Sequence, residues 1–189
     1  FEGGFQNFAD MFAERLRELG VEIRLKVAIR QIKRDQAKGS LSVDGESFDR
    51  VILACHSDQA FALLADADAL ESDVLTALPY QQNDVVLHTD TSLLPEARAA
   101  WAAWNYRVGD DPAAPASVTY NMNILQGLES TETVCVTLNG AHLIDPARVL
   151  GRVVYDHPVA TREGTLARAR RIEISGQRNT HFCGAYWGN

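Results

Sequence analysis

The sequence predicts an α+β fold with a mixed, largely antiparallel sheet and flanking helices. Three observations support this prediction. An amphipathic helix pattern opens the chain, short runs rich in β-branched and aromatic residues follow it, and Gly, Pro and Asp turn signals separate those runs. The 189 residues, of which 46% are hydrophobic, suffice to bury a packed core.

Charge and composition make several classes of partner poor candidates. The chain has 18 basic and 25 acidic side chains, which give a formal net charge of −7, and the basic residues are not clustered. Nucleic acid and anionic membrane surfaces are therefore poor partners. No apolar run approaches the roughly 20 residues of a spanning helix, and the first residues do not resemble a signal peptide. We expect a cytoplasmic protein without a membrane span.

The first third of the chain predicts a helix, a small meander and a buried strand. Apolar side chains recur at three- and four-residue steps over residues 5–19, and Gly20 marks the end of this helix. Turn signals at Lys38-Gly39 and Asp44-Gly45 separate short β-like runs. The four runs are residues 21–25, 27–34, 40–43 and 48–54.

The run VILAC has no polar alternation, which predicts a strand covered on both faces, as in a parallel sheet. Ser57 or Asp58 can cap a helix over residues 59–64, and a second helix is expected over residues 72–78. The remaining pattern predicts an antiparallel sheet followed by one long helix over residues 162–174. Its strands are residues 84–89, 102–108, 117–122, 134–138, 153–157 and 180–183, with a hairpin loop at residues 109–115.

No motif in the chain defines a catalytic centre. The GxGxxG, GxxxxGK[ST], HExxH and GxSxG patterns are not in the sequence, and the histidines lie singly, without a pair at metal-ligand spacing. His56, Ser57 and Asp58 are neighbours, but a hydrolase triad is assembled in space and not by adjacency. Cys55, Cys135 and Cys183 are far apart, so we expect free thiols and no metal site. The catalytic residues stay unknown.

An aromatic set is the most unusual feature of the second half of the chain. Alternate residues of a strand share a face, so Trp104 and Tyr106 are expected to lie together, with Tyr120 across a hairpin. Such a sheet could form a pocket wall, and ordinary cross-strand core packing explains the pattern equally well. The candidates for the substrate pocket are Trp101, Trp104, Tyr106, Tyr120 and Asn121.

The order of these segments resembles the flavin-containing amine oxidase superfamily. Gly3-Gly4 before a helix, then GVEIRLKVAIRQI and FDRVILACHSDQA, are similar to the family's passage back into its FAD-binding domain. The strings YQQNDVVLHTDTSLLP, AWNY, VTYNMN and FCGAYWG resemble a bacterial subgroup of predicted NAD/FAD-dependent oxidoreductases. FCGAYWG resembles the start of the family's closing FAD motif. There, small residues let the backbone approach the cofactor.

The resemblance implies a domain division and a set of cofactor contacts. Residues 1–60 would belong partly to the FAD-binding domain, residues 61–178 to a substrate-type domain, and residues 179–189 to the closing FAD motif, so the fold includes a remnant of the FAD-binding α/β domain. The implied contacts are Gly3, Gly4, Val27, Gly184, Ala185, Tyr186 and Trp187. The family's first dinucleotide loop and its lysine near the flavin have no counterpart in this sequence.

The resemblance also implies an activity. An FAD-dependent oxidoreductase would transfer a hydride from a small or lipid-like substrate to flavin. Because the chain opens with FEGG and ends with GAYWGN, we expect it to be a fragment that is inactive and free of FAD by itself. The alternative is a non-catalytic binding or dimerisation module of the same fold, associating as a homodimer through an exposed sheet edge.

Overall fold

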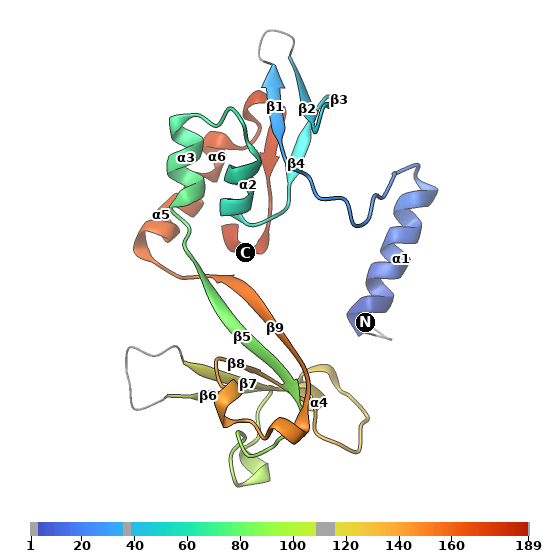
Figure 1. Cartoon of the computed structure of the whole chain (residues 1–189), viewed down its shortest axis with the longest axis vertical. Coiled ribbons are helices and arrows are strands. Elements are labelled where there is room, and N and C mark those ends of the chain that lie inside the picture. Colours follow the sequence, from blue (N-terminus) through green and yellow to red (C-terminus); the bar gives the residue numbers. More distant parts are fainter. Residues whose placement is uncertain (1–3, 36–38, 109–115, 189) are drawn as a thin grey trace. The chain divides into compact units, whose positions relative to one another are not determined.

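The computed structural model describes residues 4–35, 39–108 and 116–188, so Gly3 and the expected hairpin loop at residues 109–115 lie outside the described residues. The chain forms two compact units. Unit 1 comprises Phe1–Glu14 and Gln82–His157, and unit 2 comprises Arg15–Gln81 and Pro158–Asn189. Helices and antiparallel sheets occur in the same chain, which confirms the predicted α+β class (Figure 1).

Helix α1, Gly4–Glu18, confirms the first predicted element. Its aromatic side chains lie along one stripe, where the Phe8 and Phe12 rings stack at 5.9 Å. Gly20 follows with a φ of 82°, and its N–H bonds to the carbonyl of Arg17. Glycine adopts this left-handed conformation without the steric cost of a Cβ, which is why the helix ends here.

A three-stranded antiparallel meander follows in unit 2, formed by β1 (Ile32–Asp35), β2 (Ser40–Val43) and β3 (Glu46–Phe48). Asp44 and Gly45 both have positive φ, 48° and 91°, and make the expected tight turn between β2 and β3. The strand predicted over residues 21–25 is wrong, and the run 27–34 becomes a strand only at Ile32. The carboxylate of Asp44 accepts the N–H groups of Arg30 and Gln31, which therefore pair with a side chain and not with a strand.

Strand β4 (Val51–Leu53) pairs in parallel with β10 (Thr180–Phe182), as VILAC predicted. Leu53 and Phe182 are buried, but Ile52 is 67% exposed, so coverage on both faces is not found within the described residues. Ala60, Val74, Leu75 and Ile174, from three of the helices of the unit, share the core with Leu53 and Phe182. The helices of the unit are α2 (Ser57–Leu63), α3 (Ala69–Thr76), α5 (Arg162–Ala169) and α6 (Arg171–Ile174).

These helices differ from the predictions at their ends. α2 begins two residues earlier than expected, with His56 as its N-cap. α3 is capped by Asp68, whose carboxylate accepts the N–H of Glu71 at 2.8 Å, while Glu71 accepts the N–H of Asp68 in return. The single helix expected over residues 162–174 divides into α5 and α6 at Arg170.

Unit 1 is built on a five-stranded sheet in the order β6-β7-β8-β5-β9. Its strands are β5 (Tyr80–His88), β6 (Trp104–Arg107), β7 (Ser117–Asn121), β8 (Cys135–Leu138) and β9 (Val149–Pro158). The pairs β6–β7, β7–β8 and β8–β5 are antiparallel. A short helix that the sequence did not indicate, α4 (Met122–Gln126), follows β7. The remaining elements are 3₁₀ turns: η1 (Arg98–Ala100), η2 (Ala141–Leu143), η3 (Pro146–Arg148), η4 (Gln177–Asn179) and η5 (Ala185–Trp187).

Candidate cofactor and substrate sites

The carboxyl ends of β4 and β10 lie at the same edge of their sheet because the two strands are parallel. The N–H of Cys183 bonds to the carbonyl of Leu53 at 3.0 Å and extends the pairing by one residue. Beyond this point, one chain segment enters α2 at His56 and the other turns at Gly184. In open α/β sheets, ligands bind where the carboxyl ends of parallel strands diverge.

Hydrogen bonds tie these two segments together. The Tyr186 hydroxyl donates to the carbonyl of Cys55 at 2.9 Å. The Tyr80 hydroxyl accepts the N–H of Ser57 at 2.9 Å and lies 3.2 Å from its Oγ. The segment after β10 is therefore fixed to the start of α2 through named side chains.

Four rings form a continuous series at this edge, which we call the aromatic row: His56, Tyr80, Tyr186 and Trp187. His56 stacks on Tyr80 with centroids 4.5 Å apart, Tyr80 meets Tyr186 edge-on at 6.4 Å, and Tyr186 lies 5.1 Å from Trp187. The sequence resemblance singled out Tyr186 and Trp187. It missed His56 and Tyr80, although the position of His56 just after a predicted parallel strand was the available signal.

Burial controls the chemistry of this edge. Burial, and then the neighbouring Tyr80 hydroxyl, raises the pKa of Tyr186, and burial likewise raises the pKa of the Cys55 thiol. Both groups are protonated at neutral pH, so neither is a ready base or thiolate nucleophile. Trp187 is 8% exposed, and its nearby indole N–H opposes the rise in the pKa of the Tyr186 hydroxyl. This N–H meets hydrogen-bond geometry with no described residue. A buried donor of this kind suits a ligand acceptor.

The backbone at Gly184 has φ 146° and ψ 153°, a conformation that favours glycine. A Cβ placed there would lie 2.6 Å from a ring carbon of Tyr186. Glycine at this position is therefore required by the neighbouring ring as well as by the turn. The next residue, Ala185, is exposed and begins η5.

Val27 lies in a second, separate hollow of unit 2. This cavity of about 510 Å³ has apolar lining from Val27, Ile29, Val43 and Phe48. At its margin, the Arg24 guanidinium binds Glu22 at 2.7 Å and Glu46 at 2.5 Å. The hydrogen bonds of the described residues do not involve the backbone N–H or carbonyl of Val27.

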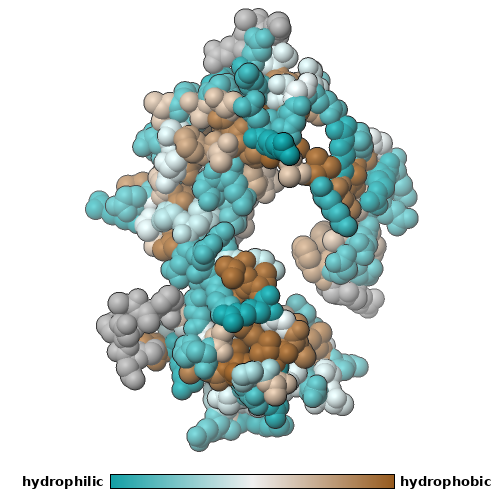
Figure 2. All heavy atoms as spheres, viewed as in Figure 1, coloured by the Kyte–Doolittle hydropathy of each residue, from teal (hydrophilic) through white to brown (hydrophobic). Residues whose placement is uncertain are grey.

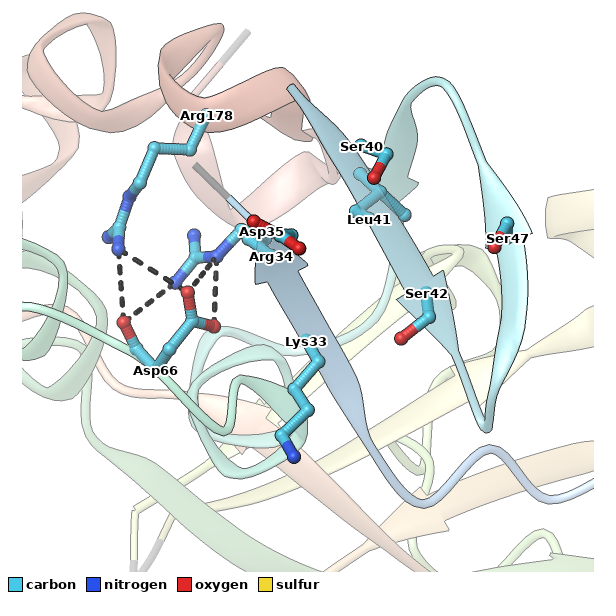
Figure 3. Close-up of a pocket in the computed structure, with 9 residues that line it drawn as sticks. All are labelled: Lys33, Arg34, Asp35, Ser40, Leu41, Ser42, Ser47, Asp66 and Arg178. Atoms are coloured by element: carbon cyan, nitrogen blue, oxygen red, sulfur yellow. Dashed lines mark hydrogen bonds and ion pairs between the residues drawn. The ribbon is translucent and has the colours of Figure 1, made fainter. Parts of the chain in front are cut away.

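A further hollow of unit 2, with a volume of about 740 Å³, is lined mainly by polar side chains (Figure 3). Arg34 holds Asp66 at 3.1 Å and Glu71 at 2.5 Å, and Arg178 reaches the same two carboxylates. Each guanidinium is therefore already paired with carboxylates, and Lys33 is a further basic side chain in the lining of the hollow. Its exposed wall comes from the outer face of the meander, Lys33, Ser42 and Ser47. The ion pairs of Arg34 and Arg178 with Glu71 join β1, α3 and the segment that precedes β10.

The sheet of unit 1 gathers most of the predicted pocket residues. Trp104 lies directly opposite Tyr120, with ring centroids 5.6 Å apart, and Tyr106 lies opposite Val118. The pairings continue across β8 and β5 and give one uncharged surface, which we call the apolar face. Its members are Trp104, Tyr120, Val136 and Leu87 in one row, and Tyr106, Val118, Leu138 and Val85 in the next.

Two of the predicted pocket residues lie elsewhere. Asn121 is 1% exposed on the opposite face of β7, where its side chain accepts the N–H of Ile124 and caps α4. Trp101 precedes β6, donates its indole N–H to the carbonyl of Pro95 at 2.8 Å, and lies beneath Arg98. The apolar face therefore includes Trp104, Tyr106 and Tyr120 of the five candidates.

The opposite, covered face of the same sheet carries a chain of polar side chains. Nδ1 of His88 accepts the N–H of Asp90, so the neutral ring donates from Nε2 to the Thr137 hydroxyl at 2.7 Å. That hydroxyl is 2.8 Å from the hydroxyl of Thr119. Burial lowers the pKa of His88 below its usual range, against the opposing charge of Asp90. This fully buried set is fixed and hydrogen-bonded, as a structural network is.

We searched the described residues for side chains that could bind a metal ion. They contain no cluster of His, Cys, Asp and Glu suited to a metal ion, and the three cysteines are free, with Cys135 buried and the other two half-buried. Burial raises the pKa of Cys135 to about 11. None of the helices that the structure describes has the length and apolar composition needed to cross a bilayer.

Comparison with known proteins finds a family match over part of the chain. Residues 1–86 match the family model described as "Flavin containing amine oxidoreductase". The family resemblance predicted from the sequence is thereby confirmed over these residues, which include α1, the meander, β4 and the first half of the aromatic row. None of the curated proteins matches the chain.

A solved structure described as a CLA-producing fatty acid isomerase from P. acnes is similar at 13% identity, with a TM-score of 0.49. The alignment covers 84% of this chain and 42% of that chain. This chain therefore spans less than half of the length of that relative.

Two features of unit 2 are compatible with binding of a flavin cofactor. At the strand ends, the buried indole N–H of Trp187 has no hydrogen-bond partner among the described residues, and the turn at Gly184 lies against the ring of Tyr186. At the second hollow, the open backbone of Val27 lies between apolar side chains. The family that matches residues 1–86 is described as flavin-containing, and these are two places in the described residues where such a cofactor could be contacted.

Proposed function

We propose that this chain is part of an FAD-dependent oxidoreductase in which bound flavin accepts a hydride from a small or lipid-like substrate. The observation that carries the proposal is the return of β10 to β4. It brings the glycine turn, Tyr186 and Trp187 to a strand that lies within the flavin-containing family match. The flavin supplies the hydride chemistry when it is bound, and the protein positions it and excludes water.

We propose the following roles for the residues. Gly3, Gly4, Val27, Gly184 and Ala185 would approach the cofactor through their backbones, and Tyr186 and Trp187 would lie beside its ring. Trp104, Tyr106 and Tyr120 would line the substrate, whereas Trp101 and Asn121 would support the ends of β6 and β7. We assign no catalytic acid or base, because burial raises the pKa of the Tyr186 hydroxyl and this hydroxyl donates to the carbonyl of Cys55.

We also propose that the chain by itself holds no flavin. Its sequence has no strand–GxGxxG–helix unit, which binds the pyrophosphate in dinucleotide-binding domains. The division into residues 1–60, 61–178 and 179–189, and the cytoplasmic location, stay predictions of the same kind. The alternative is a non-catalytic binding or dimerisation module of this fold.

The test is an absorbance spectrum of the purified full-length protein that contains this chain. Flavin bands that stay with the protein on gel filtration, and that bleach when substrate is added without oxygen, are the expected result. The Trp187→Phe variant should weaken flavin binding, because it removes the unpartnered N–H and keeps an aromatic ring. A folded, colourless protein that takes up no added FAD would overturn the proposal and favour the non-catalytic module.

A further inference from the structure

The five-stranded sheet of unit 1 has an inverted pattern of polarity. Antiparallel sheets with one wet face place apolar residues on the core side and polar residues in water. Here the covered face contains buried Thr119, Thr137, Asn121 and His88, and the outer face contains the eight members of the apolar face, of which Val85 is the one buried member. Apolar residues reach the surface of the unit (Figure 2). The pattern indicates that the outer face contacts a ligand or partner instead of bulk water.

The size of the face favours a small occupant. Its two rows cross four strands, so three strand spacings give a width of about 14 Å. Eight side chains are far fewer than the roughly 20–30 residues that each partner contributes to a standard protein interface. Trp104 and Tyr106 at the β6 margin are each 67% exposed, whereas Val118, Val136 and Leu138 between the margins are half-buried. Tall rings beside a lower aliphatic floor suit a narrow, extended molecule.

The lack of charge on the apolar face indicates which kind of molecule can bind there. None of its eight members is charged, so no carboxylate is present there to pair with a cation. Polar groups occur at one end, where Asn83 follows the alternation of Val85 on β5. The side chain of Asn83 bonds to Nδ1 of His157 at 2.9 Å and to Asn139 at 2.7 Å. These groups are uncharged amides beside an imidazole, which suit a hydroxyl or carbonyl head.

We infer that the apolar face binds the aliphatic chain of an acyl or alkyl compound with an uncharged polar head, and not an amine cation. This inference rests on the proposed function, because it names the substrate class of the same site. The aliphatic chain lies on Val118, Val136 and Leu138 between the aromatic margin and β9. The head meets the cluster of Asn83, Asn139 and His157.

The experiment measures binding to the chain itself, without flavin. The probe is the methyl ester of cis-parinaric acid, whose head is uncharged and whose polyene fluorescence rises in apolar surroundings, and the competitors are 1-decanol and decyltrimethylammonium at equal concentrations. We expect saturable binding that 1-decanol displaces and the ammonium compound does not. Trp104→Ala and the isosteric pair Val118→Thr with Val136→Thr should each weaken probe binding about tenfold, since both reduce the apolar area.

Ile172→Ala serves as the matched control, because Ile172 is an equally apolar side chain, 77% exposed on α6 in unit 2. It should leave probe binding unchanged. The Thr pair guards against misfolding, since β-branched residues keep strand geometry. Each of three results would overturn the inference: no saturable binding, equal loss in the Ile172→Ala control, or stronger displacement by the ammonium compound. A dimer in sedimentation that Trp104→Ala dissolves would instead assign the face to a second copy of the chain.

The two proposals fail separately. A full-length protein that binds flavin while the chain binds no probe would sink only the substrate class. A chain that binds the probe within a protein that never binds flavin would sink the oxidoreductase and leave an acyl-binding module.

Discussion

The meander of unit 2 and the sheet of unit 1 distribute polarity in opposite ways. The meander turns Ile32 and Leu41 inward and exposes Lys33 and Ser47, whereas the five-stranded sheet buries threonines and exposes Trp104. Both sheets are antiparallel and both have one covered face. The alternation of side chains along a strand therefore defines two faces but does not say which face is polar. The segments or ligands that contact each face decide that.

The largest expected effect comes from the inward side of the meander, where Arg34 is 8% exposed and bonds to Glu71. Glu71→Ala leaves a buried guanidinium short of a partner and should lower the free energy of unfolding by about 3–5 kcal/mol. Urea denaturation measures this change. Lys33→Ala on the outer side should stay within about 0.5 kcal/mol. Similar losses in the two variants would mean that the meander does not separate an inner from an outer face.

A smaller effect is expected from the covered polar face of unit 1. Thr137→Val removes the hydroxyl between His88 and Thr119 and leaves a buried imidazole N–H unpaired. The free energy of unfolding should fall by about 1–3 kcal/mol. Val136→Thr, the neighbouring change on the apolar face, should cost less because a half-buried hydroxyl can reach water. If Thr137→Val proves neutral and Val136→Thr does not, the assignment of the two faces is wrong.

The pH dependence of stability gives the smallest effect. Burial lowers the pKa of His88 in the folded state, so the unfolded chain takes up its proton first as pH falls. The contribution of the neutral ring is complete above the unfolded pKa of about 6.5, and it is lost as pH falls from there towards the lower folded pKa. The slope cannot exceed about 1.4 kcal/mol per pH unit for one proton. Stability curves of wild type and His88→Asn, measured between pH 7.5 and 5, should diverge only below about pH 6.5; parallel curves throughout would refute the assignment.

The sequence predicts local features well and their surroundings poorly. The helix ending at Gly20, the turn at Asp44-Gly45 and the β4 strand all follow from nearby residues, and all three are found. The alternation that puts Trp104 with Tyr106 and Tyr120 on one face is also found. These features depend on spacing within a few residues, which the sequence shows directly.

What the sequence could not show depends on distant segments. Leu93 and Ile144, from loops far apart in the chain, pack on Val86 and decide which face of the sheet is covered. The side chain of Asp44 takes the backbone N–H groups of residues that were expected to form a strand. His56 joined the candidate site only through its stacking on Tyr80, a ring that lies beyond two intervening helices in the sequence.

The pairing of β4 with β10 has a consequence for how the chain reaches its fold. Unit 2 is assembled from two stretches of chain, and the stretch that forms unit 1's sheet lies between them. During synthesis the sheet can therefore form first, and the adjacency of β5 and β9 then brings the two distant stretches close together. This shortens the loop that must close before β10 finds β4 and reduces the entropy lost in that step. The order of folding would thus be sheet first and cofactor edge last, so slow maturation of the edge is expected in variants that weaken the sheet.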